Sequence, residues 1–393
     1  MVTLILYTND KSIFILYKEK NGEFSDCFCH ICWVEKARNY CVEISFILLL
    51  VSFQSYAALN EVKDSVAKND YRIMFYNVEN LFDPFHDTLK NDYEFVAGGA
   101  RGWNWNKFIK KIQNISKVVI TAGGWQPPEI VAFSEVENRF VIAQMLKRTP
   151  LERFNYRIIH EESPDERGID VAMIYRPDKF REFEHHTINI NLPDSIKTRC
   201  ILYVKGQFIN EETGFYSDTI HLFINHWPSR TGGPAQTMHR REKAALTLRH
   251  QIDSLISLNP DSHIILTGDF NDEPIDESVQ IHLGTEKDTS VFGADLYNLM
   301  TKYLNLYDTG TNKFRNQWGL IDMFIVSESL IRDSSDTNYP MLRVKSAEIL
   351  RFPFLIQTDE KYSGTVPYRT YHGMQYQGGF SDHLPILLTL SLY

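Results

Sequence analysis

The feature that most restricts the fold of this chain is a series of short apolar runs, each joined directly to a polar residue. Residues 73–76, 130–134 and 264–268 are such runs, and a further one covers 384–392. The polar residues at these junctions are Asn77, Glu135, Asp269 and the pair Asp382 and His383. An apolar strand buries its middle inside a sheet, so polar groups at the ends of several strands can gather on one rim. The pattern therefore predicts a sheet-based core with one polar edge.

Further runs of the same kind extend this prediction along most of the chain. We expect strands near 72–77, 130–135, 156–160, 169–176, 200–209, 219–226, 262–269, 320–326 and 384–392. Helical patterns cover 105–121, 137–148 and 235–257, where apolar residues recur at roughly helical spacing. The chain has no internal repeat or long linker, so we predict one large domain of the α/β (α+β) class. Many strands with helices between them indicate mixed sheets that carry their helices outside.

The first 57 residues differ in character from the rest of the chain. Residues 44–53 are almost continuously apolar, follow Lys36 and Arg38, and precede the small residues Ser55 and Ala57. This layout is typical of a secretory signal peptide. We therefore expect residues 1–57 to be an upstream extension plus signal peptide, and residues 58–393 to be the mature domain of a secreted or periplasmic protein. A membrane anchor or a buried segment is the alternative interpretation.

Two carboxylates from separate runs, Glu135 and Asp269, are the best candidates for holding a metal ion, because Mg²⁺ prefers carboxylate oxygens. Asn271 follows Asp269 at a spacing of two residues. In an extended chain that spacing points both side chains to the same side. Asp269 could then orient an attacking water while Asn271 donates a hydrogen bond to a phosphoryl oxygen.

His383 is the first candidate for an essential histidine, because a carboxylate-bound imidazole can exchange a proton or stabilise a charged transition state. Its carboxylate partner need not be its neighbour in sequence. Asp322 lies inside a strongly apolar run, where an isolated charge is costly. Pairing Asp322 with His383 would explain both residues and leave Asp382 free for a metal.

A second carboxylate and histidine are available in Asp170 and His226, which begin and end two other runs. His226 could donate a proton to the leaving oxygen, while Asn225, Ser229 or Arg230 contacts phosphate. The start of the third helical pattern carries His239, Arg240, Arg241 and Lys243. This cluster is either a solvated helix face or a phosphate-facing group, and we take Arg241 as a substrate-binding candidate.

Taken in order along the chain, these residues resemble the endonuclease/exonuclease/phosphatase superfamily, which has the deoxyribonuclease-I-like fold. The resemblance covers about Tyr71 to Leu392. The elements that carry it are Asn77, Glu135, Asn225-His226, Gly268-Asp269-Phe270-Asn271, Asp322 and Ser381-Asp382-His383. It implies a four-layer α/β sandwich in which two mixed β-sheets pack face to face with helices outside and the site at one edge.

The resemblance also implies roles for the candidate residues. Glu135 would bind the catalytic Mg²⁺, for which Mn²⁺ is a possible substitute, with Asn77 and Asp382 nearby. Asp269 and Asn271 would position the nucleophile and the phosphate. In the two remaining pairs, Asp322 would orient His383 and Asp170 would support His226.

The superfamily contains nucleases, sphingomyelinases and inositol-polyphosphate phosphatases, so the fold restricts the reaction class more than the substrate. We predict a secreted or periplasmic, Mg²⁺-dependent phosphodiesterase that acts on nucleic acid as a monomer without a membrane span. The alternatives are a phosphatase or sphingomyelinase-like phospholipase, or a non-catalytic binding protein that retains the fold. The net charge is −9, so the protein as a whole does not attract a polyanion. Binding of a polyanion would depend on local positive charges, from residues such as Arg101, Arg230, Arg240 and Arg241.

Overall fold

The computed structural model describes residues 5–9, 12–18, 24–27, 70–124, 126–194, 196–210, 214, 216–291, 293–332 and 341–392. The predicted signal-peptide segment lies outside these residues. The chain divides into two units at Lys68 and Asn69. In the first unit, an antiparallel sheet has the order β1-β2-β3 and consists of β1 (Ile5–Asn9), β2 (Ser12–Lys18) and β3 (Phe24–Cys27).

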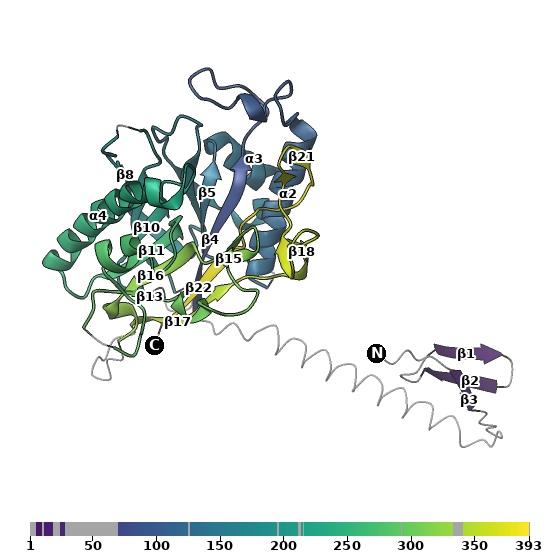
Figure 1. Cartoon of the computed structure of the whole chain (residues 1–393). Coiled ribbons are helices and arrows are strands. Elements are labelled where there is room, and N and C mark those ends of the chain that lie inside the picture. The colour runs from purple at the N-terminus through teal and green to yellow at the C-terminus, as the bar shows by residue number, and fades with distance from the viewer. Residues whose placement is uncertain are drawn as a thin grey trace. The chain divides into compact units, whose positions relative to one another are not determined.

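The second unit contains a seven-stranded mixed sheet (Figure 1). Its strands are, in spatial order, β12 (Thr285–Glu286), β13 (Leu296–Asn298), β16 (Asp322–Ser327), β11 (His263–Asp269), β10 (Ile220–His226), β9 (Ile201–Phe208) and β8 (Phe180–Ile188). The pairs β10–β11 and β12–β13 are parallel, and the other neighbours are antiparallel.

A six-stranded mixed sheet is the second layer of strands. Its order is β17 (Leu342–Ile349), β22 (Ile386–Leu392), β4 (Asp70–Leu81), β5 (Ile130–Val136), β7 (Asp170–Tyr175) and β6 (Arg157–His160). Only β4 and β5 are parallel neighbours in this sheet.

Three long helices flank the sheets: α2 (Trp105–Ala122), α3 (Arg139–Arg148) and α4 (Pro234–Leu258). Asn104 and Asn138 cap α2 and α3, each by accepting a backbone N–H with its side chain. Three small hairpins are β14 (Asn312–Phe314) with β15 (Gln317–Gly319), β18 (Ile356–Thr358) with β19 (Thr365–Pro367), and β20 (Tyr371–His372) with β21 (Gln375–Tyr376). Short helical turns are η1 (Tyr93–Phe95), η2 (Pro150–Phe154), η3 (Ser278–His282), η4 (Thr301–Tyr303), η5 (Glu328–Leu330) and η6 (Pro353–Leu355).

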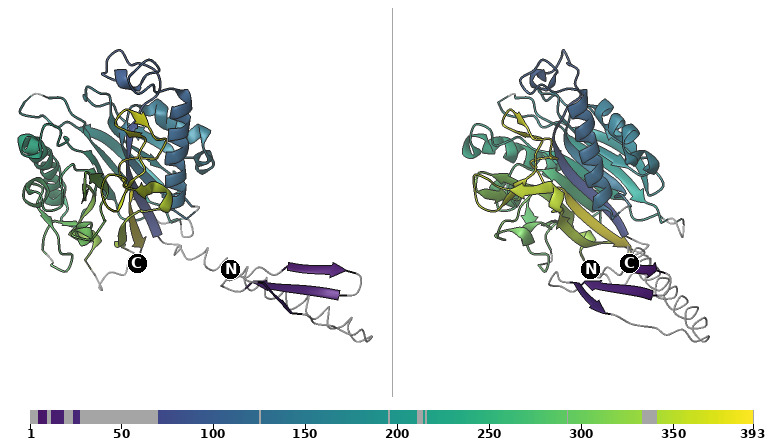
Figure 2. Two further views of the ribbon diagram at one scale, coloured as in Figure 1. Left: turned by 45° about the vertical axis from the view of Figure 1, so that its right-hand side comes forward. Right: turned by 90° about the vertical axis from the view of Figure 1, so that its right-hand side faces the viewer.

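The six-stranded sheet is apolar on both faces, and successive residues of β4 show how the layers are assembled. Ile73 and Phe75 belong to the core shared with the seven-stranded sheet, whereas Met74 and Tyr76 belong to the core beneath α2 and α3. Strand side chains alternate between faces, so one strand supplies both cores. Figure 2 shows α4 on one outer side and α2 with α3 on the other, with both sheets between them. This is the predicted four-layer sandwich, and the fold prediction is confirmed.

One edge of this sandwich, called here the polar edge, collects the predicted strand-end residues. The parallel pairs β4–β5 and β10–β11 all end there, while the antiparallel strands β7 and β16 begin there. His383, which precedes β22, lies at the same edge. Within the part of the chain that the structure describes, no helix is long and apolar enough to cross a membrane.

Candidate active site

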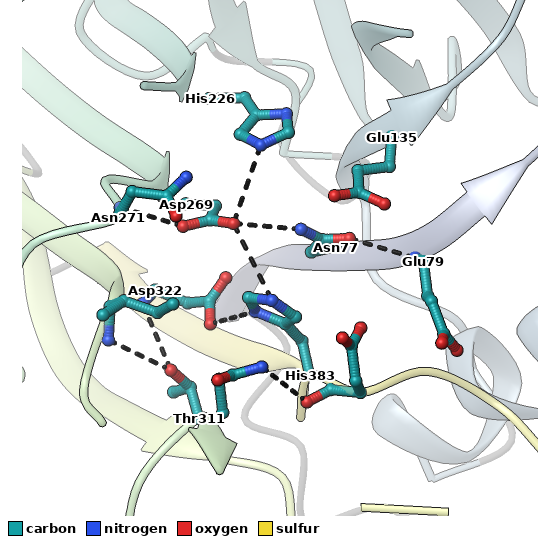
Figure 3. A network of polar contacts seen from close by, with 12 residues as sticks. Asn77, Glu79, Glu135, His226, Asp269, Asn271, Thr311, Asp322 and His383 are labelled. Carbon is teal, nitrogen blue, oxygen red and sulfur yellow. Dashed lines mark hydrogen bonds and ion pairs between the residues drawn. The ribbon is translucent and has the colours of Figure 1, made fainter. Parts of the chain in front are cut away.

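Asp269, the last residue of β11, is the centre of the site and is buried (Figure 3). Its Oδ2 accepts a hydrogen bond from Asn77 Nδ2 at 3.0 Å, and its Oδ1 accepts one from the Asn271 N–H at 2.9 Å. The Nε2 atoms of His226 and His383 both lie 3.8 Å from Oδ2. The structure thus brings together predicted residues that are far apart in sequence and come from both sheets.

Strand register explains why these side chains meet. The parallel pairing of β10 with β11 places His226 opposite Asp269, and the antiparallel pairing of β11 with β16 places Asp322 opposite the same residue. Gly268 has a φ of 149°, and a Cβ atom there would lie 2.2 Å from the Asn225 carbonyl oxygen. Only glycine fits this approach between β10 and β11.

The predicted pair of His383 and Asp322 is present, with His383 Nδ1 and Asp322 Oδ2 2.7 Å apart. The hydroxyl of Thr311 accepts the Asp322 N–H at 3.2 Å, and the hydroxyl of Ser381 accepts the His383 N–H at 3.1 Å. Burial alone would lower the pKa of His383, but the carboxylates of Asp322 and Asp269 outweigh it and raise that pKa well above its usual value. These charges favour the protonated imidazole of His383, which Asp322 orients.

The other histidine has the opposite character. Burial lowers the pKa of His226 well below its usual value, and the charges of Arg199 and Arg167 act in the same direction. These effects favour the neutral imidazole of His226, which can act as a hydrogen-bond donor or acceptor. Burial raises the pKa of Asp269 to about 7, where His383 opposes the shift and Asp322 adds to it. Neighbouring groups whose protonation is driven apart in this way are typical of acid–base sites.

Glu135 lies at the same edge in a strained backbone conformation, with a φ of 61°. Two residues of β4, Glu79 and Asn80, also have left-handed φ values, of 49° and 54°, within a bulge between Asn77 and Leu81. The Asn80 N–H donates to Glu135 Oε2 at 2.8 Å, and the Glu79 N–H donates to Asn77 Oδ1 at 3.0 Å. The bulge therefore orients two of the predicted metal ligands, as strained backbone often does at functional sites.

The residues present fit a divalent cation. Among the described residues, Asn80 alone donates a hydrogen bond to the Glu135 carboxylate, which leaves the other oxygen available, and Figure 3 shows this carboxylate beside the Asn77 amide. Asp322 Oδ1 is buried and has no hydrogen-bond partner in the described part of the chain. Asp269, Asp322 and His383 also place ligand atoms within 4.8 Å of one another.

Carboxylate and amide oxygens are the ligands that hard divalent ions prefer. Glu135, with Asn77 and Asp382, would hold the ion at this edge, because Glu135 and Asp382 are partly exposed there whereas Asp269 and Asp322 are buried. A bound divalent cation supplies Lewis acidity toward a phosphoryl oxygen.

Asp382 is held by a charged network that the sequence did not reveal. Arg369 donates to Asp382 Oδ2 at 2.8 Å and to Glu79 Oε1 at 3.1 Å. The buried Lys111 ammonium donates to the Phe380 carbonyl at 2.6 Å and lies 4.0 Å from Glu79. Burial lowers the pKa of Lys111 to about 8, whereas burial and the charge of Asp382 raise the pKa of Glu79.

Of the three network residues that sequence reasoning missed, only Glu79 carries a usable signal. It lies two residues after Asn77 inside an apolar strand, where a charged side chain needs a partner. Arg369 lies outside the strands and Lys111 lies within an ordinary amphipathic helix, so neither has a comparable local signal.

The predicted support of His226 by Asp170 is wrong. Asp170 Oδ2 lies 3.1 Å from His160 Nε2, and its Oδ1 accepts the Ser163 N–H at 2.9 Å. The reason is topological, since Asp170 and His160 lie on paired strands of the six-stranded sheet and His226 lies in the other sheet. No described residue forms a hydrogen bond with His226 Nδ1.

Two substrate-binding predictions are also wrong. Asn225 is fully buried, and its side chain donates to the carbonyls of Phe223 and Thr267 at 3.2 Å and accepts from Trp227 Nε1 at 3.1 Å. Arg241 is only 1% exposed, and its Nε lies 2.7 Å from Asp272 Oδ1. Both side chains are therefore bound within the protein and are unavailable to a phosphate.

The remaining predictions need refinement. Arg230 is half-exposed, but its guanidinium donates to the Asn271 carbonyl at 2.6 Å and to Asp272 at 2.9 Å, so it orients the loop that follows β11. Asn271 has a φ of 52° and is not extended. Its side chain donates to the Trp227 carbonyl at 3.0 Å, so the same-side geometry expected from a two-residue spacing is absent.

Comparisons with known proteins complete the description of this site. The chain matches no curated protein sequence. Its fold is similar to that of a humanized D. rerio TDP2 carrying 14 mutations, with 14% identity and a TM-score of 0.49, over 82% of this chain and 99% of that chain. It is also similar to the Bacteroides thetaiotaomicron mannosyl-6-phosphatase Bt3783, with 17% identity and a TM-score of 0.48, over 81% of this chain and 99% of that chain. The human Nocturnin catalytic domain is similar with 18% identity and a TM-score of 0.47, over 82% of this chain and 95% of that chain.

The sequence itself decides the family. Residues 72–392 match the description "Endonuclease/Exonuclease/phosphatase family", a span that includes both sheets and all of the site residues described above. This chain belongs to the endonuclease/exonuclease/phosphatase family.

Proposed function

We propose that this chain is a Mg²⁺-dependent phosphodiesterase that hydrolyses nucleic acid. Members of its family are metal-dependent phosphoric ester hydrolases. The observation that carries the proposal is the placement of Asp269 Oδ2 3.8 Å from the Nε2 atoms of both His226 and His383, with the Asn77 amide bound to Asp269 and lying beside the Glu135 carboxylate (Figure 3). Phosphate ester hydrolysis needs a water-orienting base and donors for the developing charge, and this group of residues supplies both.

Each residue has a specific task in this proposal. Asp269 orients the attacking water and accepts its proton. The imidazolium of His383, held by Asp322, stabilises negative charge on the phosphoryl group. His226, being neutral, donates a hydrogen bond through Nε2 to a non-bridging or leaving oxygen, so its role differs from that of a charged acid. Mg²⁺ is the proposed ion because all the proposed ligand atoms are oxygens.

The preference for nucleic acid is supported by the form of the polar edge. Glu135 and Asp382 are partly exposed at the ends of strands, so a long substrate can cross the site. Arg369 binds Glu79 and Asp382 through Nε and Nη2, but it is 37% exposed, so its remaining N–H groups can contact a phosphate of a polyanion. Phosphomonoester and phospholipid hydrolysis are the competing outcomes.

A substrate panel tests this function. Linear DNA, RNA, sphingomyelin, inositol polyphosphate and a chromogenic diester are incubated with wild type, Glu135→Gln and the surface control Glu184→Gln, which lies on β8. We expect DNA or RNA cleavage by wild type and by the control, and a loss of about 10³-fold in Glu135→Gln. Turnover of a lipid or inositol substrate with intact nucleic acid would overturn the substrate proposal.

We also propose that the protein is exported. The support is the apolar segment at residues 44–53 with small residues Ser55 and Ala57 after it. Expression in a Gram-negative host, followed by fractionation and N-terminal sequencing, should give a periplasmic protein that begins near Ala58. Recovery of residues 36–57 in the membrane fraction would favour an anchor.

A further inference from the structure

A tight turn covers residues 165–168 and contains none of the site residues predicted from the sequence. The Gly168 N–H donates to the Asp165 carbonyl at 3.2 Å, and Gly168 has a φ of 74°. Lys90 Nζ donates to the Asp165 carbonyl at 3.3 Å and to the Ser163 carbonyl at 3.1 Å. The backbone around Arg167 is therefore held in place by Lys90, which is distant in sequence.

An ion-pair chain joins this turn to the active site. Asp165 Oδ2 accepts from Arg199 at 3.1 Å, and Arg199 also donates to the Trp227 carbonyl at 2.5 Å. Trp227 directly follows His226, and its carbonyl is the same one that accepts from Asn271. The turn is thus linked to the backbone beside His226 by two hydrogen-bonded side chains.

The turn places two guanidinium groups on this side of the site. Arg199 and Arg167 are accompanied by the acids Asp165 and Glu166, and Asp165 lies 3.6 Å from Arg167 Nε while it binds Arg199. Arg199 is buried, and its Nε has no hydrogen-bond partner among the described residues. The charges of both arginines act on His226, whose pKa burial already lowers. An exposed guanidinium that no carboxylate binds closely, beside a site proposed to hydrolyse phosphate esters, indicates an anion-binding position.

We propose that Arg167 binds a phosphate group of the substrate on the His226 side of the site. Its side chain is 49% exposed, whereas Arg199 and Arg241 are buried and Arg230 is bound to Asn271 and Asp272. Its only described carboxylate partner, Asp165, is already engaged by Arg199. The guanidinium can therefore turn toward a phosphate without breaking a close hydrogen bond. This inference rests on the proposed function only in assuming that the site takes a phosphate ester.

The test uses the whole protein and three variants: Arg167→Ala, Arg167→Lys and the control Arg332→Ala. Arg332 is 50% exposed and has a carboxylate, Asp261, at 3.6 Å and a second, Glu328, at 2.5 Å, and it lies beyond the end of β16 that is remote from Asp322. Inorganic phosphate is titrated as a competitive inhibitor of chromogenic diester hydrolysis. Binding of a labelled single-stranded oligonucleotide is measured at several salt concentrations on a Glu135→Gln background.

We expect Arg167→Ala to raise the phosphate inhibition constant and KM by about tenfold or more, with a smaller change in kcat. The slope of log affinity against log salt should fall by about 0.7, as for one lost phosphate contact on a single strand. Arg167→Lys should recover part of the phosphate affinity but not all of it, because a lysine lacks the planar fork. Arg332→Ala should behave as wild type.

An unchanged phosphate inhibition constant and salt slope in Arg167→Ala would overturn the inference. Equal losses in Arg332→Ala would also overturn it, since the effect would then reflect overall charge. If phosphate inhibition weakens in Arg167→Ala but wild type binds no oligonucleotide, Arg167 stands as a phosphate-binding residue and the nucleic-acid proposal fails.

Discussion

Replacing Asp322 by Asn tests whether the carboxylate and His383 act as one unit. The two side chains are 2.7 Å apart and buried, and the Asp322 charge is the largest contribution that raises the pKa of His383. A hydrogen bond between charged partners in such a setting contributes about 1.5–3 kcal/mol. If the whole of it is expressed in the transition state, Asp322→Asn lowers kcat/KM by about 10- to 150-fold.

The double variant gives the decisive measurement. His383→Ala removes the imidazolium itself and should lower kcat/KM by about 10³-fold. Once His383 is absent, Asp322 has nothing to orient, so the double variant should be no worse than His383→Ala alone. Independent residues would instead multiply their losses, to about 10⁴- to 10⁵-fold.

The assay is hydrolysis of a chromogenic diester under saturating Mg²⁺, with urea unfolding of each variant to exclude a folding defect. Asp218→Asn is the control, since Asp218 lies 3.8 Å from His263 Nε2 near the opposite ends of β10 and β11. It should retain wild-type turnover. Multiplicative losses in the double variant would refute the pairing and leave Asp322 as a structural acid.

Three further predictions follow from other parts of the molecule. Burial and the charge of Asp83 raise the pKa of Glu137 to about 9, so the folded state holds a proton that the unfolded state releases above its ordinary value of 4.5. The stability that Glu137 contributes should therefore be lost as pH rises toward 9, by up to about 1.4 kcal/mol per pH unit. In urea unfolding, the free energy of unfolding should fall less between pH 6 and pH 9 in Glu137→Gln than in wild type. Arg241→Ala should cost about 1.5–3 kcal/mol in thermal or urea unfolding, because Asp272 loses its buried charged partner and keeps only the partly exposed Arg230, while the salt dependence of binding stays unchanged. EDTA should abolish diester hydrolysis and Mg²⁺ or Mn²⁺ should restore it, whereas full activity in EDTA would contradict the use of Glu135 as a metal ligand.

The central strands could be predicted because their signal is local. An apolar run flanked by polar residues identifies β4, β5, β10, β11 and β22 without any knowledge of neighbours. The edge strands β8 and β17 were missed, since β8 is mostly exposed and charged and β17 alternates only weakly. Their formation depends on pairing with β9 and β22, which is a tertiary effect.

The site residues show the same difference between local signals, which the sequence reveals, and tertiary contacts, which it does not. Strand-end residues such as Asp269 and His383 were found because sheet topology brings strand ends together. Arg369 contacts Glu79 across 290 positions, and nothing in the local sequence predicts that pairing. Arg241 could have been assigned correctly, because Ala244 and Leu248 follow it by three and seven residues, which is the spacing of the buried face of α4.

The ladder between β10 and β11 has a consequence for engineering this enzyme. Seven consecutive residue pairs, from Ile220 with His263 to His226 with Asp269, fix the relative height of the two catalytic side chains. Slipping one strand by a single residue would turn its side chains to the opposite face of the sheet. The spacing of histidine and aspartate is thus a property of the backbone hydrogen bonds. A loop exchange that retargets the substrate can keep this alignment only if it spares Asn271, whose N–H binds Asp269, and Arg230, which binds the Asn271 carbonyl.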